Sequence, residues 1–134
     1  MKRSFQELPA VAGRPRPIVD LVVEGLGLAP QACLLDTGDG AIRMGRHVAE
    51  IAGIDLSDAK TREILIAGVR TQGLETIVHL ELRQGANSHS WSPSVCFCDP
   101  WPWAFGLLGL AGLDPFVTTI DTYEEWVELR PVDR

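Results

Sequence analysis

The chain has 134 residues, of which 46% are apolar and 22% charged, and its formal net charge is −6. This length suits a single domain with one hydrophobic core and is short for two domains. The negative charge argues against a general attraction to nucleic acid, and the longest apolar run, around residues 104–113, is far shorter than the ~20 residues that span a bilayer, so we expect no nucleic-acid and no membrane partner.

The first residues carry charges, glycine and proline without a sustained period, which predicts a flexible N-terminal arm over residues 1–16. A single domain over residues 17–134 is expected to follow. Val, Ile and Leu dominate residues 18–24, which predicts a strand. A second apolar strand, over residues 31–35, carries Asp36 at its end.

The middle of the chain combines one helical pattern with one hairpin pattern. Apolar residues recur at three- and four-residue steps over residues 44–51, which predicts a helix that ends at Gly53. Further on, residues 63–67 and 75–83 have the composition of strands and flank the glycine-bounded segment 68–73. We therefore expect a β-hairpin whose tip is this segment.

The last third of the chain alternates between short apolar segments and turns. It contains, in order, a polar loop over 84–90, a strand over 91–98, an aromatic loop over 99–103, an apolar segment with a short helix over 107–113, and strands over 116–120 and 126–129. Together with the preceding elements, this pattern predicts an all-β domain with one or two short helices.

The cysteines predict a reducing environment. Cys33, Cys96 and Cys98 cannot all pair within one chain, so we expect reduced thiols and a cytoplasmic location. Cys96 and Cys98 could join His79 or His89 in a metal site, but the C-x-C spacing lacks the second paired half that is usual in structural zinc sites. We favour buried strand positions for both cysteines and expect no metal and no cofactor.

The strongest chemical signal is the tripeptide Asp36-Thr37-Gly38. An apolar strand holds a carboxylate on a rigid support, the threonine supplies a hydroxyl that can brace the loop, and glycine lets a substrate approach the backbone. Three such common residues occur often by chance. Their order relative to a second motif about seventy residues later, Leu107-Leu108-Gly109, is much more specific.

This order, over about residues 17–131, resembles the retropepsin family, the single-domain retroviral-type aspartic proteases. The resemblance implies a closed β-barrel, or acid-protease half, and a homodimer in which two Asp36 carboxylates meet on the symmetry axis. It implies that Asp36 is catalytic, that Thr37 braces the two loops and that Gly38 faces the substrate. The implied activity is that of an aspartic endopeptidase, which hydrolyses extended polypeptides through a water activated by the two carboxylates.

The resemblance also suggests where a substrate would lie. It assigns five positions to substrate binding: Gly38, Asp39, Gly68, Val69 and Phe105. Gly68 and Val69 would belong to a flap, although an ordinary surface hairpin also fits the sequence there. Phe105 would line an apolar subsite, or would pack with neighbouring aromatic residues as part of the core.

Two departures from the family pattern concern the motif and the dimer. Asp39 stands where the family usually has alanine or serine; if it points toward the paired aspartates it raises their pKa, and if it faces solvent in a turn it changes little. Gly40 and Leu110 replace an acid and an arginine that brace many retroviral dimers. We therefore expect another dimer contact, for which edge pairing of residues 126–129 is a candidate.

A second function fits the same sequence. The chain would then be a catalytically silent, dimeric peptide-binding or assembly module that retains Asp36 for the architecture of the loop. The intact Asp-Thr-Gly motif favours the peptidase, because a carboxylate without a chemical role is costly to bury.

Overall fold

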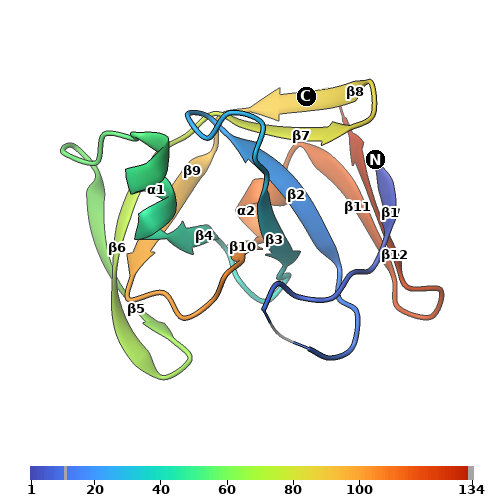
Figure 1. Cartoon of the computed structure of the whole chain (residues 1–134), viewed down its shortest axis with the longest axis horizontal. Coiled ribbons are helices and arrows are strands. Elements are labelled where there is room, and N and C mark those ends of the chain that lie inside the picture. Colours follow the sequence, from blue (N-terminus) through green and yellow to red (C-terminus); the bar gives the residue numbers. More distant parts are fainter. Residues whose placement is uncertain (11, 133–134) are drawn as a thin grey trace.

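The computed structural model describes residues 1–10 and 12–132, which form two β-sheets and two short helices (Figure 1). The helices are α1 (Arg46–Ala52) and α2 (Leu110–Leu113). The strands are β1 (Lys2–Ser4), β2 (Ile18–Val23), β3 (Gln31–Leu35), β4 (Ile42–Gly45), β5 (Lys60–Ile66), β6 (Val69–Ile77), β7 (Leu80–Gln84), β8 (Asn87–Trp91), β9 (Ser94–Asp99), β10 (Gly106–Leu108), β11 (Phe116–Asp121) and β12 (Trp126–Pro131). The predicted all-β class with two short helices is confirmed.

The larger sheet has nine strands in the order β5-β6-β9-β4-β10-β3-β2-β7-β8. Strand β10 lies between β3 and β4, parallel to β3 with Leu107 beside Leu34 and antiparallel to β4 with Leu107 beside Arg43. The two apolar motifs that the sequence separates by about seventy residues are therefore adjacent strands. This arrangement places the loop that follows β3 directly over the end of β10.

The predicted closed barrel is wrong. Strands β5 and β8 end the nine-stranded sheet on opposite sides, and within the described residues they do not pair with each other. A barrel closes only when its first and last strands share hydrogen bonds. Here a separate sheet of three strands, in the order β1-β12-β11, closes the core instead, with Val127 and Leu129 fully buried beside residues of the larger sheet.

Helix α1 is shorter than predicted because Met44 belongs to β4 and not to the helix. Gly53 ends the helix as expected: its φ of 70° lies in the left-handed region, and its N–H donates to the carbonyls of Ala49 and Glu50. Glycine adopts this conformation without steric penalty. Over the described residues, no helix is both long enough and apolar enough to span a membrane.

The predicted hairpin exists, with a tighter tip. Strand β5 pairs along its whole length with residues 69–75 of β6, and the chain turns at Ala67 and Gly68, whose φ angles are 49° and 79°. Val69 is thus the first residue of β6 and not part of a loop. The single strand predicted over residues 75–83 is divided between β6 and β7, and the polar loop predicted over 84–90 contains most of β8.

The predicted flexible arm is also different in the structure. Lys2–Ser4 forms β1, antiparallel to β12, and the side chains of Met1 and Phe5 pack against the core. The sequence hid this strand because it is short and polar and its partner lies more than 120 residues away. Residue 11 of the predicted arm and residues 133–134 of the predicted domain lie outside the described residues.

Strand β12 cannot offer the edge that the sequence suggested for a dimer. It is the central strand of its sheet, with β1 on one side and β11 on the other. The hypothesis of edge pairing through residues 126–129 is therefore wrong. The outer strands of this sheet are β1 and β11.

Candidate active site

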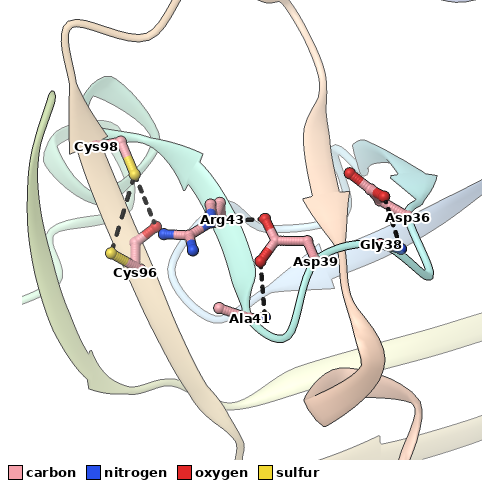
Figure 2. A network of polar contacts seen from close by, with 7 residues as sticks. All are labelled: Asp36, Gly38, Asp39, Ala41, Arg43, Cys96 and Cys98. Atoms are coloured by element: carbon pink, nitrogen blue, oxygen red, sulfur yellow. Dashed lines mark hydrogen bonds and ion pairs between the residues drawn. The ribbon is translucent and has the colours of Figure 1, made fainter. Parts of the chain in front are cut away.

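The loop after β3 is fixed by its own backbone and by β10. The N–H of Asp36 donates to the carbonyl of Leu108 at 3.0 Å, and the N–H of Asp39 donates back to the carbonyl of Asp36 at 3.1 Å. One carboxylate oxygen of Asp36 accepts the N–H of Gly38 at 3.0 Å (Figure 2). The Asp36 side chain is half-buried, so its second oxygen remains available to a ligand.

Gly109, at the end of the second motif, lets the two motifs touch. A Cβ at this position would lie 2.5 Å from the carbonyl oxygen of Asp39 and 2.3 Å from that of Ala41, so only glycine fits. The N–H groups of Gly109 and Leu110 donate to the carbonyls of Ala41 and Asp39 at 3.1 and 2.9 Å. The segment Leu107-Leu108-Gly109 thus packs directly behind the Asp36 loop.

Asp39 takes neither of the two orientations considered from the sequence. Its carboxylate forms an ion pair with Arg43 at 2.6 Å and accepts the N–H of Ala41 at 3.0 Å. The Asp39 and Arg43 side chains are only 15% and 18% exposed. Figure 2 shows the Asp39 carboxylate directed toward Arg43 and away from Asp36. Its charge is therefore compensated locally, within the same chain.

The ion pair with Asp39 also changes the pKa of Arg43. Burial opposes the charged form of Arg43, but the hydrogen bond and the negative charge of Asp39 outweigh burial and raise the pKa of Arg43. The guanidinium therefore remains charged at every relevant pH. The sequence analysis missed Arg43; its only signal was an opposite charge four residues after Asp39.

Comparison with known proteins identifies the fold. Neither a protein-family model nor a curated protein matches the sequence. Among solved structures, a retropepsin-like aspartic protease from Rickettsia conorii has a TM-score of 0.62 at 16% identity, covering 95% of this chain and 97% of that chain. The chain has the retropepsin-like fold. The retroviral protease-like domain of Ddi1 from Leishmania major is also similar, with a TM-score of 0.55 at 12% identity over 88% of this chain and 94% of that one.

In this retropepsin-like chain Thr37 is exposed at the rim of an apolar hollow of about 510 Å³. The hollow is lined by residues of the Asp36 loop, of α2 and its following turn, and of β11: Thr37, Leu110, Leu113, Asp114, Phe116, Thr118 and Ile120. The hydroxyl of Thr118 is buried there and has no hydrogen-bond partner among the described residues. Buried hydroxyls are normally paired, so this face is unsatisfied in the single chain.

The other predicted substrate residues do not meet at Asp36 in the single chain. Gly68 forms the hairpin turn, and Val69 beside it is 52% exposed. Phe105 is only 4% exposed and stacks on Trp103 at a centroid distance of 5.5 Å, while its carbonyl accepts the indole N–H of Trp101 at 3.0 Å. The structure thus places Phe105 in an aromatic cluster, which favours its packing role.

The cysteines lie apart from the histidines with which a metal site was considered. In the described residues, Cys33, Cys96 and Cys98 are all buried free thiols, and no group of three or more His, Cys, Asp or Glu side chains is placed to hold a metal ion. His79 instead lies 3.2 Å from the hydroxyl of Ser92. The sequence did not reveal that Cys96 and Cys98 are close to Arg43.

Proposed function

We propose that the protein is an aspartic endopeptidase that hydrolyses extended polypeptides with two Asp36 carboxylates, one from each chain of a homodimer. The observation that carries this proposal is the rigid Asp36 loop. Its backbone is tied to β10 and α2, while one carboxylate oxygen is left free. The likeness to solved retropepsin-like structures supports the fold that the mechanism requires.

The chemistry follows from pairing two equal acids. Two carboxylates a few ångströms apart cannot both ionise without a large repulsion, so the pair holds one proton, as in aspartic proteases generally. The ionised Asp36 removes a proton from the shared water as a general base, and the protonated one donates a hydrogen bond to the scissile carbonyl. No covalent intermediate forms. The measured pKa values belong to the pair and not to one residue.

The hairpin of β5 and β6 is the proposed flap. Leu65 and Val69, at its end, are 70% and 52% exposed, so the hairpin presents apolar side chains beyond the body of the sheet. An extended peptide held under such a hairpin would form strand-like backbone hydrogen bonds. Closure would also exclude water from the reacting groups.

Strand β11 is the proposed dimer contact, in place of β12. Within the described residues β11 pairs with β12 alone, so its other edge is open. Thr118 lies opposite Leu129, whose N–H donates to Met1 on the far side of β12. In an antiparallel ladder the backbone groups of Thr118 therefore point to the open edge. A second copy that pairs there by two-fold symmetry would also cover the hollow beside Thr37.

We also propose a cytoplasmic location, because free thiols suit a reducing compartment.

A peptide library tests the proposed activity. The purified protein and Asp36→Asn are incubated with mixed peptides between pH 4 and 7, and the products are identified by mass spectrometry. Cleavage by the parent protein and none by the variant is the expected result. Equal cleavage by both would contradict the paired-aspartate mechanism. A dimer that cleaves nothing would instead support the silent peptide-binding module.

Dilution tests the shared site. A catalyst made of two half-sites loses activity per chain when the protein is diluted below its dimer dissociation constant. Activity per chain that stays constant through the range in which sedimentation shows monomers would contradict the homodimer.

A further inference from the structure

Cys96 and Cys98 form a thiol pair on the outer face of β9. Val95 and Phe97, which alternate with them, belong to the core cluster, so the two cysteines point away from the core. Their sulfur atoms are 3.9 Å apart, and the thiol of Cys98 can donate either to the sulfur of Cys96 or to the Cys96 carbonyl at 3.6 Å. Both residues are buried, at 2% and 1% exposure.

Arg43 lies next to this pair. It is the register partner of Cys96 on the neighbouring strand β4. In Figure 2 its guanidinium lies between the two cysteines and the carboxylate of Asp39. The hydrogen bond from the Cys98 thiol, helped by the positive charge of Arg43, outweighs burial and lowers the pKa of Cys96 to about 7. The same hydrogen bond and burial raise the pKa of Cys98. Of the two thiols, Cys96 is therefore the one whose deprotonation its surroundings favour.

A glycine and a partly exposed ion pair lie beside the thiols. Gly73 on β6 faces Cys98, and a Cβ at this glycine would lie 2.3 Å from the sulfur of Cys96, so the missing side chain makes room for that sulfur. Arg62 and Glu75 flank the same glycine and form an ion pair at 3.2 Å, with side chains 46% and 30% exposed. We take displacement of this exposed ion pair, and not opening of the core, as the route by which a peroxide reaches the sulfur.

We propose that Cys96, Cys98 and Arg43 form a thiolate modification site that reacts with hydroperoxides. A thiolate beside an arginine, with a partner thiol that donates to it, is the environment in which cysteine is nucleophilic. The sulfur of Cys96 attacks one peroxide oxygen, and the S–O bond forms as the O–O bond breaks. The leaving hydroxide takes a proton from solvent, so sulfur is oxidised to sulfenic acid and hydrogen peroxide is reduced to water.

The extended conformation of β9 influences which oxidation product Cys96 forms. Residues two apart in an extended strand have Cα atoms about 6.6 Å apart, close to the upper end of the range that a disulfide tolerates. Hydrogen bonds to β4 and β6 on both sides hold β9 extended. A disulfide with Cys98 would be strained, so we expect the sulfenic acid of Cys96 to be the product that accumulates.

Oxidation of Cys96 also changes the contacts that hold the Asp36 loop. The importance of this effect rests on the proposed function. Arg43 lies beside the thiols at one end and pairs with Asp39 at the other, and the Asp39 carbonyl accepts the N–H of Leu110 behind the loop. Asp39 still holds the charge of the guanidinium, but the added oxygen of a sulfenic acid needs room beside Arg43 and displaces the guanidinium. The ion pair that fixes Asp39 then loosens.

Trapping of the sulfenic acid tests the site without any need for peptidase activity. The folded protein is exposed to hydrogen peroxide with dimedone, digested and analysed by mass spectrometry. We expect an adduct at Cys96 and none at Cys33, because burial, as the largest effect, raises the pKa of Cys33 to about 12. Equal labelling of Cys33 and Cys96, or no adduct at Cys96, overturns the proposal.

Two variants test the roles of the neighbours. Cys98→Ala and Arg43→Met each raise the pKa of Cys96; a rise of about one unit lowers the thiolate fraction at pH 7, and so the rate of labelling, about fivefold. Arg83→Met, which removes an arginine of the ion pair with Glu81 on β7, leaves the rate unchanged. Circular dichroism shows which variants remain folded. If folded Cys98→Ala is labelled at Cys96 as fast as the parent protein, the proposed role of the Cys98 thiol is contradicted.

The relay to the loop is tested only if the parent protein cleaves peptides. Peroxide then lowers the activity of the parent protein, and Cys96→Ser retains its activity in peroxide. Full activity after complete oxidation of Cys96 overturns the relay, whereas absence of cleavage before oxidation concerns the proposed peptidase alone.

Discussion

Asp39 is a carboxylate three residues from Asp36, and the chain keeps it away from the candidate catalytic group. Arg43 neutralises it at 2.6 Å, and the N–H of Ala41 satisfies its other oxygen. The sequence showed both charged residues but not their orientation, because a turn that precedes a strand can direct its side chains to either face. Arg43 lies within reach of the Asp39 carboxylate only because of the register of β4 between β9 and β10.

Asp39→Asn tests this pairing. Asparagine can still accept from Ala41 but leaves the partly buried Arg43 without its counter-charge, so we expect the free energy of unfolding to fall by about 1.5–3 kcal/mol in urea titration. The matched control is Glu81→Gln in the more exposed pair with Arg83, where the change stays within about 0.5 kcal/mol. Equal, small changes in both variants would show that Arg43 does not depend on Asp39.

Gly73 offers a second test at the scale of one residue. Gly73→Ala forces a Cβ to 2.3 Å from the sulfur of Cys96, and such overpacking lowers the free energy of unfolding by about 1–3 kcal/mol. In Gly73→Ala/Cys96→Ala the clash is removed, so the double variant should lose less than the sum of the two single variants. Gly40→Ala is the control, because its Cβ meets no atom within 4 Å. Strictly additive losses would contradict the contact.

At the scale of elements, the prediction was correct where a helix or strand depends mainly on the composition and spacing of residues close in the sequence. The hairpin of β5 and β6, the end of α1 at Gly53 and the strands β2 and β3 were all predicted from composition and spacing. Met44 was assigned to the helix because its spacing to Val48 is helical. It lies in β4 because pairing with β9 and β10 outweighs a local pattern of only two turns.

The open edge of β11 gives a prediction for the dimer. Thr118→Pro removes an N–H that points to the open edge and leaves the ladder with β12 intact, so we expect the dimer dissociation constant to rise at least about tenfold while the chain remains folded. Analytical ultracentrifugation over a dilution series measures this constant.

Thr118→Val is the control for that experiment. It replaces a hydroxyl that has no partner among the described residues by a methyl group and keeps the backbone N–H, so monomer stability should not fall. A Thr118→Pro variant that dimerises as tightly as the parent protein would eliminate β11 as the contact.

For the whole molecule, the order of the motifs and elements predicted the fold, whereas β1 and the separation of a second sheet from the first were not predictable. Asp36-Thr37-Gly38 and Leu107-Leu108-Gly109 each lie in a recognisable apolar segment, and their order, with a helix and a hairpin between them and a short helix and a strand after them, indicated a retropepsin-like fold. Strand β1 is three residues long and pairs with residues 126–128. No local property of such a short polar segment indicates so distant a partner. The predicted barrel failed for the same reason, because this sheet closes the core.

Removal of residues 1–5 tests the role of β1 in stability. The truncated chain loses the backbone pairing with β12, the packing of Met1 and Phe5, and the contact of Lys2 with the ring of Trp126 at 3.9 Å. We expect the free energy of unfolding to fall by about 2 kcal/mol or more, and the exposed edge of β12 to promote aggregation. Lys2→Ala, the control, removes only the cation–π contact and should cost less than about 1 kcal/mol. If truncation leaves the free energy of unfolding unchanged, the predicted flexible arm would be supported instead.

The hydrogen bonds between Met1 and Leu129 hold the first residue of the chain against β12, the last described strand. A short peptide linker can therefore join the two ends, with new ends opened at an exposed turn such as that between β7 and β8. If the proposed homodimer forms, two copies can also be expressed as one tandem polypeptide. In such a fusion the aspartate of one half can be replaced while that of the other is kept, which would separate the contributions of two residues that are otherwise always changed together.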